Sequence, residues 1–148
     1  MKIIKNITTI LSDFDNNNPF RIAAELNIEL LYYPFSDNIK GTYIRNSNNN
    51  NHFIILNSSL NTTMERFVLA HEIGHSLLHP NINRYYIKKH TLLSTNKIEK
   101  EANLFAAELL IDDDQLHSLL ENGESLPWIA FELNVPKELI SLKIKNLG

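Results

Sequence analysis

The chain of 148 residues contains no cysteine, so a disulfide framework is excluded. Any bound metal must therefore be held by histidine, aspartate or glutamate. No segment approaches the roughly 18 consecutive apolar residues that a membrane-spanning helix needs. Residues 1–18 contain a short apolar run, but polar residues interrupt it and the cleavage site of a signal peptide is missing. We therefore expect a cytoplasmic protein with no membrane partner.

The chain also has little excess charge, since it contains 14 lysines and arginines and 17 aspartates and glutamates, and the formal net charge is -3. Strong non-specific binding to nucleic acid needs a basic surface that neutralises phosphates, so we expect no direct nucleic-acid partner. Hydrophobic residues make up 43% of the chain, which is enough for a sizeable core. The length is typical of one domain, and we predict a single domain over residues 1–148.

The first part of the chain mixes helical and strand patterns. A short helix is predicted over residues 3–14, and a second one starts at Pro19 and stops at Asn27. Three strands then follow, because their residues are rich in β-branched and aromatic side chains: "IELLYY", "GTYIR" and "HFIILN". The Asn-rich stretch "NSNNNN" between the last two has the composition of a hairpin loop. We expect an antiparallel three-stranded sheet.

In the second part of the chain, from residue 62 onward, the sequence pattern predicts helices. Thr62 and Glu65 form a capping box at the start of a helix that Pro80 ends. The segment "KIEKEANLFAAELLI" predicts a second amphipathic helix, and the tail from residue 115 onward has the pattern of two or three short ones. The order of helix, small sheet and helices predicts an α+β fold.

The most informative stretch is "AHEIGH", in which His71 and His75 are four residues apart and Glu72 follows the first. Residues i and i+4 lie on one face of a helix, so the two imidazoles can bind one tetrahedral metal ion. Glu72 lies about 100° round the helix, where it is poorly placed as a ligand but can reach a water on the open side of the ion. The alternative is two histidines that share a helix by chance. The capped, amphipathic helix is the context that supports the metal motif instead.

A catalytic zinc usually has three protein ligands, and the chain lacks the third histidine of an H-E-x-x-H-x-x-G-x-x-H motif. The second amphipathic helix offers glutamates instead. Glu101 borders its apolar face and ranks first, Glu108 ranks second, and Glu99 is expected to point toward solvent. His79 lies too far along the first helix to share the ion easily, so we expect it to cap or to pack.

The two segments "RFVLAHEIGHSLLH" and "EKEANLFAAELLI" together resemble the ImmA/IrrE family of zinc metallopeptidases. The resemblance spans roughly residues 19–148, and the combination of motifs is much more specific than H-E-x-x-H alone. In this family the third ligand is the glutamate of an E-A-[ND]-x-F-A motif, which falls on Glu101 here. The resemblance thus agrees with the ranking from helix geometry.

The resemblance implies a particular centre: one Zn²⁺ per chain held by His71, His75 and Glu101, with a water in the fourth position. Glu72 then acts as the general base and afterwards as the acid. The resemblance also implies a fold in which a zincin-like helical layer packs against the sheet, within a single metallopeptidase domain. We divide that domain into an N-terminal helix and sheet, the helices that carry the motif and the ligand glutamate, and a C-terminal helical tail: residues 1–60, 61–111 and 112–148.

Further site residues are less well defined by the sequence. Asn103 falls where the family carries Asn or Asp, and we expect it to orient a metal-ligating histidine. A zinc peptidase also needs a donor for the oxyanion of the tetrahedral intermediate. Four candidates remain open and unranked: Tyr43, Tyr85, Tyr86 and His90.

The implied function is a gluzincin-like peptidase that cleaves or inactivates a helix-turn-helix repressor, and thereby acts as the anti-repressor of a mobile element, phage or stress response. Two alternatives stay open: a repressor-binding protein without proteolysis, and the toxin of a toxin–antitoxin pair. The tail "WIAFELNVPKELISLKIKNL" also has the pattern of a DNA-binding helix-turn-helix. Residues 126–148 carry a net charge of only +1, so packing or protein recognition is favoured over DNA binding.

Overall fold

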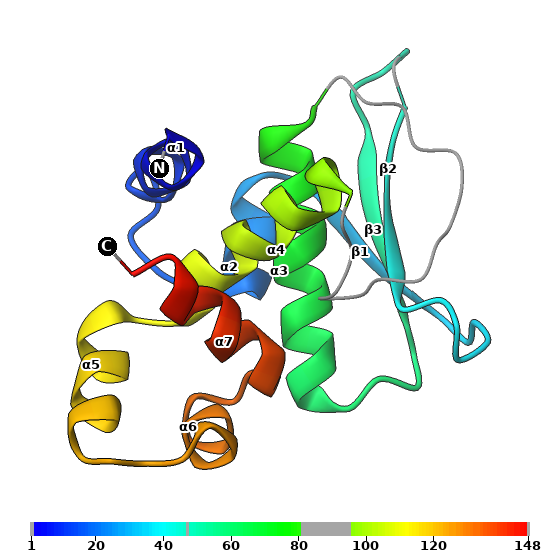
Figure 1. The fold of residues 1–148 in the computed structure, drawn as a ribbon. Helices are drawn as coiled ribbons and strands as arrows, with labels where there is room; N and C mark the ends of the chain where they lie inside the picture. The colour runs from blue at the N-terminus through cyan, green and yellow to red at the C-terminus, as the bar shows by residue number, and fades with distance from the viewer. Residues whose placement is uncertain (1, 47, 81–95, 148) are drawn as a thin grey trace.

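The computed structural model describes residues 2–46, 48–80 and 96–147, and the structural statements below concern those residues. They form seven helices and one three-stranded sheet, so the predicted α+β class is confirmed (Figure 1). None of the described helices is long and apolar enough to cross a membrane.

Two short helices precede the sheet. The first, α1 (Lys2–Leu11), ends earlier than predicted, and α2 (Pro19–Glu25) begins at the predicted proline. The Asn18 side chain caps α2 by accepting a hydrogen bond from the backbone N–H of Phe20. Asn27 has a φ of 58°, which confirms the predicted left-handed stop after this helix.

The three strands are those predicted: β1 (Glu29–Tyr33), β2 (Gly41–Arg45) and β3 (His52–Asn57). Their arrangement differs from the antiparallel sheet that we expected. The strand order is β1-β3-β2, with β2 antiparallel to β3 and β1 parallel to it. The chain direction still reverses at each connection, but β3 lies in the centre, where Ile54 and Leu56 are fully buried. Placing the third strand between the first two makes β1 and β3 parallel.

Helix α3 (Thr62–Leu78) is the centre of the molecule and lies between the sheet and helix α4 (Lys97–Leu110) (Figure 1). Its N-cap is Asn61 rather than the predicted Thr62, and the Asn61 side chain accepts from the backbone N–H of Met64. Ten consecutive residues of α3 are buried, from Phe67 to Ser76. A helix covered on all sides in this way can hold polar side chains in a dry, fixed position.

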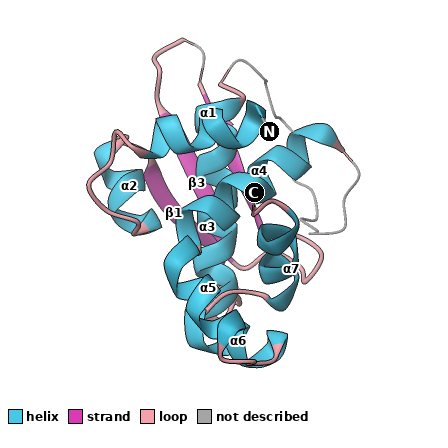
Figure 2. Cartoon of the chain, turned by 60° about the vertical axis from the view of Figure 1, so that its left-hand side comes forward, coloured by secondary structure: helices cyan, strands magenta, loops and turns pink. Residues whose placement is uncertain are grey.

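The tail, predicted to hold two or three short helices, forms three: α5 (Asp113–Glu121), α6 (Leu126–Leu133) and α7 (Lys137–Lys145). Helix α7 packs on α4 and α6, while α5 and α6 lie at the end of the molecule away from the sheet (Figure 2). The buried Lys143 of α7 binds two carboxylates at 2.6 Å, those of Glu108 in α4 and Asp113 in α5. This ion-pair cluster joins the tail to the central helices.

Candidate metal centre

Helix α3 presents both histidines of the motif on its buried face. His71 and His75 are each 1% exposed, and their Nε2 atoms are 3.1 Å apart. Two ligand nitrogens on one tetrahedral zinc ion are expected roughly 3.3 Å apart, given zinc–nitrogen bonds of about 2.0–2.1 Å. The i, i+4 spacing therefore places the two imidazoles as a metal pair requires.

Helix α4 brings the carboxylate of Glu99 to the same point. Its Oε2 lies 2.7 Å from Nε2 of His75 and 3.6 Å from Nε2 of His71. Among the described residues, these three form a group that could hold a metal ion. Glu99 is only 4% exposed, so the expectation that it points toward solvent is wrong. Two imidazoles and one carboxylate are donors that zinc accepts, and the donor set therefore fits such an ion.

The structure does not bring Glu101 to the two histidines, which differs from the predicted third ligand. The Glu101 Oε1 instead lies 2.9 Å from Nε2 of His79, and Nδ1 of His79 lies 3.4 Å from Nδ1 of His75. Glu108, the second-ranked candidate, pairs with Lys143. Glu101 therefore contacts the centre only through His79, on the outer side of the His75 ring.

Asn103 contacts the centre where we predicted a positioning residue. Its side-chain oxygen lies 2.7 Å from Nδ1 of His71, and it is 2% exposed. Because a carbonyl oxygen can only accept, Nδ1 of His71 carries the hydrogen and donates it. The Nε2 atom of the neutral ring then keeps its lone pair, directed toward Glu99 and His75.

Replacement of Asn103 by alanine should therefore lower the affinity for zinc by about 10- to 100-fold, the usual effect of losing such a partner. The affinity can be measured by competition with a chromogenic chelator. Asn103→Asp, which keeps an oxygen acceptor, should retain most of the affinity. Equal affinities in the wild type and Asn103→Ala would show that this hydrogen bond does not orient the ring.

The electrostatics of the centre suit metal binding. Burial lowers the pKa of His75 to about 4, although a hydrogen bond to the Glu99 carboxylate and the charge of Glu72 act in the opposite direction. His75 is therefore neutral at neutral pH, as a metal ligand must be. Glu72 is itself buried, with 1% of its surface exposed, and its negative charge is close enough to influence His75.

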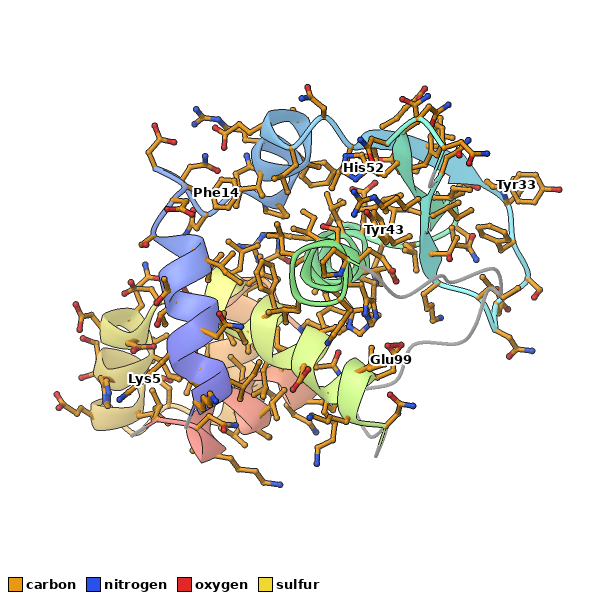
Figure 3. All side chains as sticks on the ribbon, turned by 90° about the horizontal axis from the view of Figure 1, so that it is seen from above. Lys5, Phe14, Tyr33, Tyr43, His52 and Glu99 are labelled. Carbon is orange, nitrogen blue, oxygen red and sulfur yellow. The ribbon has the colours of Figure 1, made fainter. Side chains whose placement is uncertain are left out.

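Of the four candidate oxyanion donors, only Tyr43 is among the residues that the structure describes. Tyr43 is buried in β2, and its hydroxyl lies 3.0 Å from Nδ1 of His52, whose Nε2 lies 3.0 Å from the Leu26 carbonyl oxygen. Nε2 of His52 thus donates to that carbonyl, and the Tyr43 hydroxyl donates to Nδ1. Figure 3 shows Tyr43 beside His52 and apart from Glu99. The other three candidates lie outside the described residues: Tyr85, Tyr86 and His90.

Gly74 sets the distance between the two helices that carry the centre. A Cβ at this position would lie 3.0 Å from Cβ of Phe105 and 3.1 Å from its ring. Phe105 is fully buried in α4. The missing side chain therefore lets α4 approach α3 closely enough for Glu99 to reach the histidines.

We expect Gly74→Ala to destabilise the protein, because overpacking of a buried contact costs about 1–3 kcal/mol and exceeds the helix-propensity gain of about 0.5–1 kcal/mol. Chemical denaturation would measure the change in the free energy of unfolding. The Gly74→Ala/Phe105→Ala double variant should be less affected than the sum of the single variants, since Phe105→Ala removes the ring atoms at 3.1 Å and leaves only the Cβ contact. An unchanged or raised stability of Gly74→Ala would refute the close approach as the reason for this glycine.

Comparison with known proteins identifies the family of the chain. The family described as the IrrE N-terminal-like domain, Peptidase_M78, matches residues 23–145. The chain is 35% identical to "Uncharacterized immunity region protein 2" of Bacillus phage phi105 over 137 residues, which cover 93% of this chain and 85% of the relative. It is 27% identical to "Metallopeptidase ImmA" of Bacillus subtilis (strain 168) over 146 residues, which cover 96% of this chain and 83% of the relative. The protein therefore belongs to the ImmA/IrrE family, Peptidase_M78, which its histidine and glutamate motifs indicated.

Proposed function

We propose that this protein is a zinc-dependent endopeptidase in which His71, His75 and Glu99 hold one Zn²⁺ per chain. The observation that carries the proposal is the buried convergence of these three donors from two helices, beside the buried carboxylate of Glu72. A structural zinc site normally has four protein ligands, whereas a catalytic one has three and leaves a position open. The three-donor set thus favours chemistry over a purely structural role.

Glu72 performs the proton transfers in this proposal. Zinc held at the centre supplies a Lewis acid that polarises a peptide carbonyl and acidifies a water. A carboxylate oxygen of Glu72 accepts a proton from the water as the water oxygen bonds to the carbonyl carbon. When the carbon–nitrogen bond breaks, Glu72 returns the proton to the leaving amine nitrogen. Asn103, and Glu101 through His79, hold the two histidine rings in place.

The substrate in this proposal is a helix-turn-helix repressor encoded beside the gene, and its loss would induce a mobile element or phage, or a stress response. Support comes from the family resemblance and from one relative that is named an immunity region protein of a phage. The net charge of -3 also disfavours direct action on DNA and favours a protein target. A peptidase that acts on a DNA-bound regulator works in the cytoplasm.

The proposal is tested by incubating the purified protein with the helix-turn-helix protein encoded next to it. We expect a cleaved product that disappears with a chelator and returns when zinc is added back. A repressor that stays intact but co-purifies with this protein in a fixed ratio would contradict proteolysis and support sequestration. Mass spectrometry of the products would locate the scissile bond.

A further inference from the structure

Helix α6 carries two large aromatic side chains on its outer face. Trp128 is 45% exposed and Phe131 is 75% exposed, and their rings stack with centroids 5.6 Å apart. The neighbouring Ile129 and Ala130 are buried and account for the packing of α6 on the rest of the tail. Single exposed apolar residues are ordinary, but a stacked pair on one helix face is an apolar surface available to a partner.

A hollow lies between α5 and α6. Its volume is about 430 Å³, and both polar and apolar side chains line it: Asp114, Gln115, Ser118, Leu119, Glu132 and Leu133. Glu132 joins the hollow to the aromatic pair, because it lies four residues after Trp128 and next to Phe131 on α6. We call the hollow and the aromatic pair together the α5–α6 face.

The charge of this region has one sign. Residues 112–135 contain six carboxylates and neither lysine nor arginine. Asp112 caps α5 and Asp113 pairs with Lys143. The remaining acidic residues are exposed: Asp114, Glu121, Glu124 and Glu132.

The cations that flank the α5–α6 face leave its charge negative. Arg66 of α3 reaches the end of α6, but its guanidinium is half-buried and donates to the backbone oxygens of Leu133 and Asn134. Lys137 lies in the first turn of the next helix. A face of this charge repels nucleic acid, although the tail has the sequence pattern of a helix-turn-helix.

We propose that the α5–α6 face docks a basic segment of the protein substrate, in which an apolar side chain is flanked by lysine or arginine. The docking proposal rests on the proposed function in one respect, because it takes the basic segment to belong to the protein substrate. The stacked rings supply the apolar anchor and a surface for a guanidinium, and the carboxylates pair with the flanking cations and speed the encounter. Because the face is separate from the metal centre, docking there raises the local concentration of the cleavable segment.

The single tryptophan of the chain makes the docking measurable without catalysis, since Trp128 is the only source of indole fluorescence. The probe is a synthetic amphipathic helical peptide of lysine and leucine, titrated into the full-length Glu72→Gln protein. We expect a saturable change in Trp128 emission that weakens as salt is added. The matched peptide with glutamate in place of lysine should bind at least tenfold more weakly.

Two variants connect binding to the named side chains. Phe131→Ser should weaken peptide binding by about tenfold and Glu132→Gln by a few fold, while thermal unfolding stays at the wild-type temperature because these side chains are exposed. Equal binding of the two peptides, no binding, or wild-type affinity in Phe131→Ser would overturn the proposal. An emission change that depends only on protein concentration would also overturn it and assign the face to a second copy of the chain.

Docking at the α5–α6 face and the proposed proteolysis can be refuted independently of each other. Peptide binding needs neither zinc nor Glu72, so a protein that fails to bind the peptide would leave the proposed proteolysis standing. If the repressor is cleaved, Phe131→Ser should raise KM for the intact repressor by about tenfold and leave kcat unchanged. An unchanged KM would show that the substrate does not dock at this face.

Discussion

Replacing Glu72 by glutamine is expected to reduce repressor cleavage by about 10²- to 10⁴-fold, the usual contribution of a general acid–base residue. Glutamine has nearly the same volume as glutamate, and the site is 1% exposed, so the packing around it stays the same. The amide, however, cannot take a proton from water or return one to an amine. Initial rates of cleavage and the zinc content per chain by mass spectrometry measure the two effects separately.

The metal content decides how a loss of activity is interpreted. Glu72 is not among the three convergent donors, so Glu72→Gln should keep its zinc. Glu65→Gln is the matched control, because it removes the same charge from the first turn of α3, two turns before the motif. A Glu72→Gln protein that cleaves the repressor at the wild-type rate would refute the mechanism, and one that loses zinc would show that Glu72 supports the metal instead.

The parts of the centre that depend on one helix alone could be predicted from the sequence. His71 and His75 share a face because of their spacing, and the structure places their Nε2 atoms 3.1 Å apart. The position of Asn103 beside a histidine was also predicted, from the family motif. The strands and most helix boundaries follow from local composition and capping chemistry for the same reason.

The glutamate that reaches the histidines depends on how two helices pack, and there the prediction from the apolar face of α4 failed. That helix contacts α3, α1 and α7, so its buried surface extends well beyond one stripe. A signal was nevertheless present in the sequence. Glu99 and Asn103 are four residues apart and share a face, whereas Glu101 lies about 200° away from Asn103 around the helix. If Asn103 faces a histidine, Glu99 does too.

The order of the strands could not be predicted either. The three strand segments were correctly located, but a hairpin loop between the last two says only that β2 and β3 pair. β1 can join the free edge of β2 or of β3, and the strand that it joins becomes the central one, whose inward-facing side chains pack against the helices. With Ile54 and Leu56 fully buried, β3 takes the central position.

The roles of the two glutamates of α4 are separated by their effect on zinc. Glu99→Gln should lower the affinity by more than 100-fold, because its carboxylate is one of the three convergent donors. Glu101→Gln should lower it by about 10- to 100-fold at most, since Glu101 acts only through the ring of His79. Chelator competition on the purified proteins gives both affinities.

Glu99→Gln and Glu101→Gln serve as controls for each other, because the substitutions are the same and lie two residues apart on one helix. His79→Gln should reproduce the modest effect of Glu101→Gln, and combining the two should add little, since they act through one contact. The opposite order, with Glu101→Gln losing zinc and Glu99→Gln keeping it, would restore Glu101 as the third ligand. The His79–Glu101 pair would then have to open to free that carboxylate for the metal.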